Sequence, residues 1–399
     1  MTLTKHDITY LVGGKHEDSR PFKPFNDVQC EFLNALSTFL RNNKDAQRFP
    51  DVLTFAFWCR KGNITRLRNE FGDSHHRLGL GKVFHVAPSN VPVNFAYSYA
   101  FGLLAGNVNY VRLPSRNFPQ VDVICHALNE VLALPEFSVL QSVSHFFRYG
   151  HQSEITTELS AQCQGRLIWG GDETIREIRR SPIQVRGVDI AFSDRFSFCC
   201  LGATNLTSIP DAELDRLALG FYNDTYLMDQ NACSSPHLIV WVGEPKEVAI
   251  AKERFWGRLQ LIVHEKYLLS TKAAVDKQAL FCQNAIELEN IVAAEIRDTS
   301  LFRIELGTLP KNIDSMRGNC GYFYEFQTKD LDTVSDIVNP TYQTLTYAGL
   351  EKTSLIDFVL KNRLSGIDRI VPVGSALDIS VIWDGYHVIR SLSRIIDLR

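Results

Sequence analysis

The sequence predicts an α/β fold in which largely parallel β-sheets are covered by helices. From residue 81 onward, runs rich in β-branched and aromatic residues alternate with segments of helical periodicity. Two of these alternations, at residues 83–112 and 166–192, form compact strand–helix–strand units. With 399 residues, of which 45% are hydrophobic and 22% are charged, the chain can build a sizeable core and more than one domain.

The first half of the chain contains both compact units. A helix is expected at residues 26–41, and the turn 88–92 separates a strand at 83–86 from an apolar helix at 94–105, which Gly106 ends. The other elements expected up to residue 201 are strands at 108–112, 166–169, 188–192 and 198–201, and a helix at 173–180 after the tight turn Gly170-Gly171-Asp172.

The second half begins near residue 205, where we place the main domain boundary. A helix at 211–228 has Pro210 near its first turn, and a strand at 237–242 follows it. The remaining expected elements are helices at 245–267, 271–293, 354–364 and 386–396, and strands at 302–306, 322–326, 344–347 and 369–373.

Composition excludes several classes of function. The net charge of −3 shows no excess of basic residues, so no nucleic-acid partner is expected. No apolar run approaches the ~20 residues that span a bilayer, and the first residues lack the features of an export signal. The nine cysteines form no CxxC pair, which favours reduced thiols in a cytoplasmic protein. No metal site is expected, because HExxH and paired CxxC motifs are missing from the sequence.

Cys233 is the candidate nucleophile. It lies in a small polar segment, DQNACSSP, at the junction between a predicted helix and a predicted strand. A buried structural thiol usually has apolar neighbours, whereas a reactive thiol needs access. Cys199 and Cys200 lie in an apolar strand pattern and Cys282 on a helix, so these three are expected to be packing residues.

Four further residues are candidates for binding. Asn90, in APSNVPV, could donate its side-chain amide to an oxyanion, or could simply be a turn or capping residue. Gly170 and Gly171 open a helix after a strand, where a diphosphate can meet free backbone N–H groups, although the motif is not GxGxxG. Arg112, at a strand end, could reach an adenosine ribose or its phosphate, or could be an exposed charge.

The order of these segments resembles one family. VFHVAPSNVPVNFAYSYAFGLLAGNVNYVRL, LIWGGDETIREIR and MDQNACSSPHLIVW are similar to segments of the acyl-CoA reductase (LuxC) family of the aldehyde dehydrogenase superfamily. QTLTYAGL, GIDRIVPVG and WDGYHVIRSL resemble that family's closing segments, so the likeness covers roughly residues 80–399. The best-known members supply fatty aldehyde to bacterial luciferase.

The resemblance implies an aldehyde-dehydrogenase-like fold. A Rossmann-type dinucleotide-binding domain would occupy residues 1–205 and an α/β catalytic domain residues 206–354, with part of 355–399 returning to the first domain or to an oligomerisation arm. Cys233 would accept the acyl group, and its backbone N–H would form an oxyanion hole with the Asn90 side chain.

The cofactor residues follow from the same resemblance. Pro88, Gly170 and Gly171 would lie along the dinucleotide, with Arg112 near its adenosine ribose. NAD-preferring relatives often carry an acidic residue where this chain has Ser115, beside Arg116. An acid would repel a 2′-phosphate and these residues would not, so NADPH is favoured, with NAD(H) as the alternative.

Two departures from the superfamily pattern bear on the reaction. Aldehyde-oxidising relatives activate a hydrolytic water with a glutamate in an ELGGK-like stretch, and the corresponding residues 191–195, AFSDR, lack it. A thioester enzyme without that base should keep its acyl group for reduction or thiol exchange. The glutamate of the E-x-F-G-P motif is also missing, since the nearest match is SMRGN at 315–319.

These observations predict an NADPH-dependent reductase. Its substrate would be a fatty acyl thioester, of CoA or of an acyl carrier, and its product the aldehyde. A homo-oligomer and an acyl-activating or acyl-transferring partner enzyme are expected. One alternative is the reverse chemistry, a CoA-acylating aldehyde dehydrogenase for short aldehydes. Another is a non-catalytic binding or scaffold subunit with the same fold.

Overall fold

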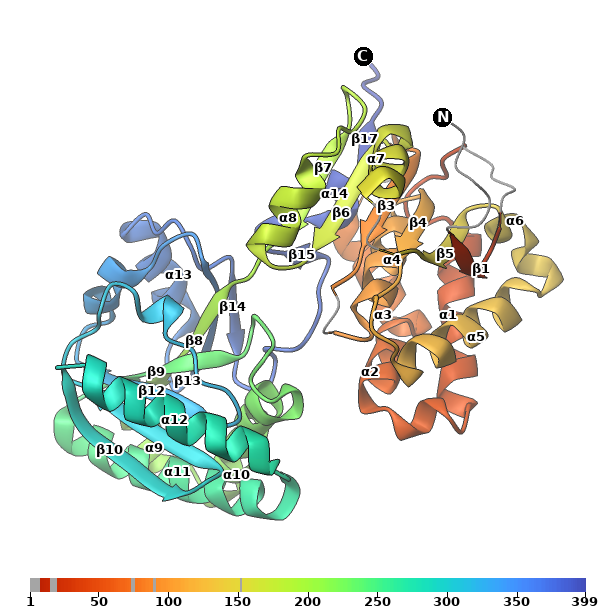
Figure 1. Ribbon diagram of the computed structural model, residues 1–399. Coiled ribbons are helices and arrows are strands. Elements are labelled where there is room, and N and C mark those ends of the chain that lie inside the picture. The colour runs from red at the N-terminus through yellow and green to blue at the C-terminus, as the bar shows by residue number, and fades with distance from the viewer. Residues whose placement is uncertain (1–7, 15–19, 73–75, 89–90, 151–152) are drawn as a thin grey trace. The chain divides into compact units, whose positions relative to one another are not determined.

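The computed structural model describes residues 8–14, 20–72, 76–88, 91–150 and 153–399 (Figure 1). The chain divides into two compact units, Met1–Ser193 with Ser380–Arg399, and Asp194–Ile379. The sequence placed the boundary near residue 205. The division falls earlier because strand β8 (Phe196–Gly202) pairs with β9 (Pro236–Val242) and β13 (Tyr342–Ala348) of the second unit. Of the segment 355–399, only the last twenty residues belong to the first unit.

The first unit contains a six-stranded sheet in the order β1-β5-β4-β3-β6-β7. All of its strands are parallel except β1, which pairs antiparallel with β5. The strands are β1 (Thr9–Val12), β3 (Lys82–Val86), β4 (Val108–Arg112), β5 (Ser144–Arg148), β6 (Gly165–Trp169) and β7 (Val188–Phe192). The chain runs outward from β3 to β5 and returns to β6 on the other side of β3. The carboxyl ends of β3 and β6 therefore form a topological switch point, where open α/β sheets bind ligands.

Helices follow the strands of this sheet in the expected alternation. Their bounds are α1 (Asp27–Asn42), α2 (Pro50–Trp58), α3 (Lys61–Phe71), α4 (Asn94–Leu104), α5 (Pro119–Leu132), α6 (Ser138–Gln141), α7 (Ser153–Gln162) and α8 (Asp172–Arg179). Helix α4 packs on β3 and β4, and nearly all of its residues are buried. This explains its mostly apolar sequence, which has no polar face.

A buried polar network fastens α4 to the sheet. His85 of β3 is fully buried; its Nε2–H donates to Asn109 Oδ1 (3.1 Å), and its Nδ1 accepts the Ser98 hydroxyl (2.8 Å). The tautomer follows because Asn109 uses its amide group to donate to the carbonyl of Asn107. Gly102 makes room for the network, since a Cβ there would lie 2.0 Å from Asn109 Oδ1. His85 is therefore a packed, hydrogen-bonded core histidine.

The last residues of the chain were predicted wrongly as a helix at 386–396. Helix α14 covers only Val388–Ser391, between β16 (Tyr386–His387), which pairs with β15 (Ile382–Trp383), and β17 (Ser393–Ile395), which pairs with β2 (Arg77–Gly79). The Arg77 guanidinium donates to the carbonyls of Arg390 and Ser393, and so ends the helix after one turn.

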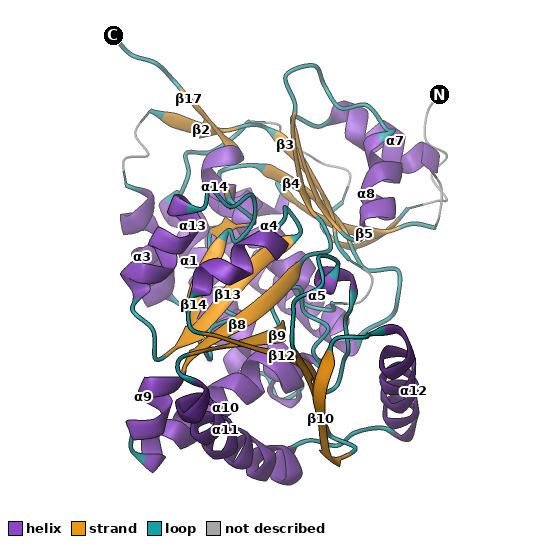
Figure 2. Cartoon of the chain, turned by 90° about the vertical axis from the view of Figure 1, so that its left-hand side faces the viewer, coloured by secondary structure: helices purple, strands orange, loops and turns teal. Residues whose placement is uncertain are grey.

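The second unit contains a seven-stranded sheet in the order β10-β11-β12-β9-β8-β13-β14 (Figure 2). All pairs are parallel except β10 with β11. The strands not yet bounded are β10 (Ile291–Asp298), β11 (Leu301–Leu306), β12 (Tyr322–Thr328) and β14 (Arg369–Pro372). One core packs α9 (Ala203–Ser208), α10 (Asp211–Thr225) and α11 (Pro245–Lys266) on one face, and a second core packs α12 (Thr271–Glu287) and α13 (Lys352–Lys361) on the other.

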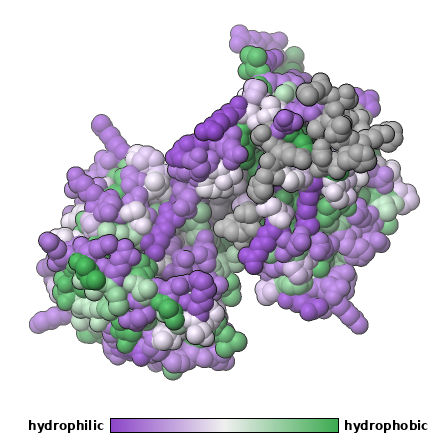
Figure 3. All heavy atoms as spheres, viewed as in Figure 1, coloured by the Kyte–Doolittle hydropathy of each residue, from purple (hydrophilic) through white to green (hydrophobic). Residues whose placement is uncertain are grey.

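The predicted helix at 271–293 is too long at its C-terminal end. Helix α12 stops at Glu287, and the residues from Ile291 form the edge strand β10. The segment IVAAEI is compatible with either a helix or a strand, and pairing with β11 makes it a strand. Both elements leave apolar side chains exposed, including Val275, Ile286 and Val292. The face seen in Figure 3 is otherwise mostly hydrophilic, with hydrophobic side chains in small groups.

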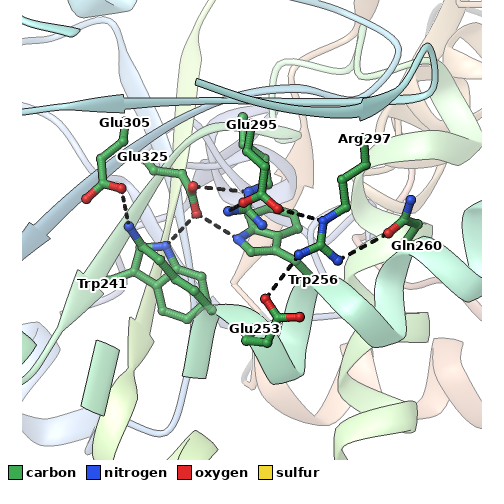
Figure 4. Close-up of polar contacts among 10 residues, drawn as sticks. Trp241, Glu253, Trp256, Gln260, Glu295, Arg297, Glu305 and Glu325 are labelled. Carbon is green, nitrogen blue, oxygen red and sulfur yellow. Dashed lines mark hydrogen bonds and ion pairs between the residues drawn. The ribbon is translucent and has the colours of Figure 1, made fainter. Parts of the chain in front are cut away.

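A polar network attaches α11 to the far strands of this sheet (Figure 4). The buried Glu325 of β12 accepts the indole N–H groups of Trp241 (2.8 Å) and Trp256 (2.7 Å) through one oxygen, and Arg303 Nε (3.3 Å) through the other. Arg303 also pairs with Glu295 of β10. A buried carboxylate is tolerated at this position because both of its oxygens accept hydrogen bonds.

Short 3-10 helices complete the described fold at Ala46–Arg48, Pro135–Phe137, Tyr226–Met228, Ile313–Ser315 and Leu331–Ile337. Among the described residues no single helix is long and apolar enough to cross a membrane, and only the pair Pro119–Leu132 and Pro135–Gln141, bent by 97°, reaches the required length and composition.

Candidate active site

Cys233 lies in the loop that enters β9, at the amino edge of the second unit's parallel sheet. Its side chain is half-buried, and its Sγ donates to Asp194 Oδ1 at 3.7 Å. The same carboxylate oxygen accepts Arg317 Nη1 at 2.7 Å. Asp194 precedes β8 and Arg317 precedes β12, the two neighbours of β9 in the sheet. Parallel pairing therefore gathers three residues that are distant in sequence at one edge.

The loop that carries Cys233 is held by Gln230. This side chain is fully buried and donates to the carbonyls of Pro236 and Tyr322, while its own carbonyl accepts the N–H groups of Gly321 and Tyr322, all at 3.0–3.1 Å. Gln230 has a φ of 62°, so the chain turns sharply just before the cysteine. Three of these hydrogen bonds fix the turn to the start of β12, and the fourth fixes it to Pro236 of β9.

Two serines hold the backbone on either side of the thiol. Ser197 of β8 donates its hydroxyl to the carbonyl of Cys233 (2.7 Å) and accepts the N–H of Thr344 (3.1 Å). Ser235 donates to the carbonyl of Asp224 at the end of α10 (2.7 Å). The polar residues around the cysteine therefore form a rigid support for it.

His237 lies next to this cluster and carries no charge at pH 7. Burial, and then the nearby Arg317 guanidinium, lowers the pKa of His237 to about 4. Its Nδ1–H donates to the carbonyl of Gly318 (3.0 Å), and its ring stacks on Phe196. His237 thus fixes the segment that follows Arg317, and its lowered pKa makes it a weak general base.

The three cysteines expected to be packing residues differ from Cys233 in their exposure. Cys199 and Cys200 are fully buried in β8, as predicted, and burial raises the pKa of Cys199 to about 12. The prediction that Cys282 is a packing residue is wrong, because its side chain is exposed on α12. Its helical position was visible in the sequence, but the face it occupies was not.

The candidate cofactor residues of the first unit meet at the carboxyl edge of its sheet. Pro88 follows β3, and Gly170 and Gly171 follow β6, so they lie at the switch point between these two strands. Gly171 is the N-cap of α8, with φ −66°, and a Cβ there would meet no atom within 4 Å. Neither backbone conformation nor packing requires glycine here, so the backbone N–H groups at this end of α8 are open to approach. Asn90 lies outside the described residues.

Arg112 ends β4, next to β3 in the same sheet. Its guanidinium lies over the ring of Tyr149, 4.4 Å from the centroid, and the Tyr149 hydroxyl bonds with Thr156 (2.8 Å). Ser115 and Arg116 follow and are exposed. The structure thus supplies cations and a hydroxyl, and no carboxylate, at positions 112, 115 and 116.

A family model for acyl-CoA reductase (LuxC) matches residues 60–395. The chain belongs to the acyl-CoA reductase (LuxC) family. A long-chain acyl-protein thioester reductase from Vibrio harveyi is 24% identical over 303 residues, which cover 74% of this chain. The chain spans 58% of that relative's length.

Solved structures that resemble this LuxC-family chain are aldehyde dehydrogenases. A benzaldehyde dehydrogenase from Corynebacterium glutamicum is 12% identical with a TM-score of 0.59, covering 93% of this chain and 84% of that one. Aldehyde dehydrogenase 21 from Physcomitrella patens is also 12% identical, with a TM-score of 0.63 and coverage of 93% and 86%. At this identity the likeness shows the fold alone, and it confirms the predicted aldehyde-dehydrogenase-like fold.

The LuxC family and this fold imply a nicotinamide cofactor, and the first unit fits one. A helix N-terminus with an open glycine lies at the switch point, as dinucleotide diphosphates require. The first turn of α8 also carries two carboxylates, Asp172 and Glu173, and Arg176 pairs with both and compensates one of their two charges.

Sequence reasoning missed two residues of the LuxC-family cysteine site, Asp194 and Arg317. Both lie in stretches that the sequence singled out for a missing glutamate, at 191–195 and 315–319. The superfamily glutamate would stand at position 191, which is alanine here, and Asp194 lies three residues after it. The signal that could have found them is the position of both stretches just before predicted strands of one parallel sheet.

Proposed function

We propose that this chain reduces an acyl thioester to the aldehyde with NADPH, through a thioester on Cys233. The observation that carries this proposal is the half-buried thiol, held by Gln230 and Ser197 in a polar loop, in a chain of the LuxC family. A rigid, accessible cysteine is the nucleophile that acyl transfer requires.

The proposed reaction begins at Cys233. Its thiolate attacks the carbonyl carbon of the substrate thioester, and the tetrahedral oxyanion is held by the Cys233 backbone N–H and the Asn90 amide. Collapse expels the carrier thiol and leaves the acyl group on Cys233. The nicotinamide, when bound, supplies the hydride that reduces this thioester. Cys233 then leaves as thiolate when the aldehyde forms, which sulfur does more readily than serine oxygen.

The two units take separate roles in this proposal. The first unit holds the dinucleotide with Pro88, Gly170 and Gly171, and the second unit carries the nucleophile. Arg112 and Ser115 lie where the adenosine ribose would bind, and the absence of a carboxylate among residues 112, 115 and 116 favours NADPH over NADH. A homo-oligomer, expected from the superfamily resemblance, is testable by light scattering.

The substrate class is a fatty acyl thioester. The Vibrio harveyi relative is named for protein thioesters, so acylated carrier or partner proteins are included besides acyl-CoA. An aldehyde product is reactive, which favours direct transfer to a partner enzyme.

The test is incubation with a series of acyl-CoA chain lengths and either NADPH or NADH. We expect the cofactor to be oxidised with formation of one aldehyde per cofactor, and the reaction to be faster with NADPH than with NADH. Folded protein that oxidises neither cofactor at any chain length contradicts the proposal. Faster reaction from short aldehydes with NADP⁺ and CoA identifies the reverse enzyme instead.

A further inference from the structure

One carboxylate oxygen at the cysteine site has two donors. Asp194 Oδ1 accepts the Cys233 thiol at 3.7 Å and the Arg317 guanidinium at 2.7 Å. The Asp194 side chain is 57% exposed, so water reaches it, whereas Arg317 is 26% exposed. Asp194 is thus a hydrated carboxylate at the position of the proposed thioester.

A carboxylate at this position can promote hydrolysis of an acyl-enzyme. The acyl carbon is bonded to Sγ, and a separation of 3.7 Å from Sγ to Oδ1 is one that a single water can bridge. A water that gives its proton to Asp194 forms the new C–O bond as the C–S bond breaks. Cys233 thiolate leaves and regains that proton, and the product is a carboxylic acid with no reduction.

We propose that Arg317 suppresses this hydrolysis by occupying Asp194, and so directs the acyl group to the aldehyde. The proposal rests on the proposed function and deepens it. Arg317 donates to the oxygen that faces the thiol, so a water that needs this oxygen as its acceptor must compete with a charged donor already bound to it.

Arg317 is itself fixed in place. Its Nε donates to the carbonyl of Asp314 (3.1 Å), and its guanidinium lies 5.9 Å from the centroid of the Phe196 ring. The next residue, Gly318, is held by His237. Arg317 therefore acts as a positioning residue through Asp194, and has a defined orientation before substrate arrives.

The test measures the lifetime of the acyl-enzyme without NADPH. The protein is loaded with a fatty acyl-CoA, desalted and followed by intact-protein mass spectrometry. Because the ion pair is partly exposed, we expect Arg317→Gln to lose its acyl group about three- to fivefold faster than the unchanged protein. Arg317→Lys, which keeps the charge, is expected to stay near the original rate.

The double variant Arg317→Gln/Asp194→Asn decides the cause. Without the carboxylate its acyl-enzyme should last as long as in the unchanged protein, whereas a merely structural role of Arg317 leaves the double variant as short-lived as the single one. Asp368→Asn, which removes the ion-pair partner of Arg195 at the same sheet edge, is the matched control and should change nothing.

Two outcomes overturn the proposal, namely an unchanged lifetime in Arg317→Gln, or a double variant that decays as fast as Arg317→Gln. If no variant, nor the unchanged folded protein, takes up an acyl group on Cys233, the proposed function itself fails. Circular dichroism of each variant separates these results from loss of fold.

Discussion

At the scale of single residues, Gln230 shows how a polar sequence prepares a cysteine for chemistry. The sequence predicted that Cys233 lies in an accessible polar loop, because small polar residues surround it. It could not predict which polar residue holds the loop, since the partners of Gln230 belong to the distant segment Gly321–Tyr322. Likewise Asp194 is 39 residues from Cys233 along the chain and meets it only through the sheet.

Gln230→Glu is expected to destabilise the second unit strongly. The amide of Gln230 donates to two backbone carbonyls, and a carboxylate would instead face them with negative charge in a fully buried position. Breaking such a buried network costs about 3–5 kcal/mol of unfolding free energy. Urea denaturation measures this loss. Gln327→Glu, at an exposed position of β12, should change stability by no more than about 0.5 kcal/mol. Similar stabilities of the two variants contradict the role given to Gln230.

At the scale of elements, the sequence correctly predicted the helices and strands whose local residue pattern alone distinguishes a helix from a strand. Strand β3, helix α4 and strand β9 have mostly apolar sequences bounded by turn residues, and the structure places them within one or two residues of the predicted limits. Strands β10 and β17 were missed because their state depends on pairing with β11 and β2. Residues 291–296 and 393–395 suit a helix as well as a strand when taken alone.

The network that joins β3, α4 and β4 should make stability depend on pH. Burial lowers the pKa of His85 to about 4, against 6.5 for an exposed histidine, and burial does the same for His237 in the second unit. The unfolded chain therefore binds more protons between these values, so the stability from each neutral histidine is complete above pH 6.5 and is lost as pH falls toward 4. The loss is at most about 3 kcal/mol per histidine.

Urea denaturation between pH 7 and pH 4 tests this expectation. His85→Gln keeps a side-chain donor for Asn109 but cannot take up a proton, so its stability should fall less steeply with pH than that of the unchanged protein. The decrease that remains belongs to His237 and to ordinary surface groups. If His85→Gln and the unchanged protein show equal slopes, His85 does not contribute to acid sensitivity.

At the scale of the whole molecule, each unit has its own parallel sheet and its own candidate residues. The alternation of strands and helices was enough to predict an α/β fold, but not the strand order that assigns each strand to a sheet. Strand β8 looks in sequence like a continuation of β6 and β7, and only its pairing with β9 and β13 places it in the second unit. This is why the boundary predicted near residue 205 follows β8, whereas the division of the structure precedes it.

Because the candidate nucleophile and the candidate cofactor residues belong to different units, we expect single substitutions to abolish acylation without abolishing cofactor binding. Cys233→Ser removes the thiol from the second unit, and we expect acyl loading to fall by at least about a thousandfold, because a serine hydroxyl without an adjacent base is a weak nucleophile. NADPH affinity, which depends on residues of the first unit, should stay within about twofold. Mass spectrometry and fluorescence titration measure the two properties, with Cys282→Ser, an exposed thiol on α12, as the control that keeps both. Continued acylation of Cys233→Ser means that another residue is the nucleophile, and loss of NADPH binding means that the two units do not divide the reaction as proposed.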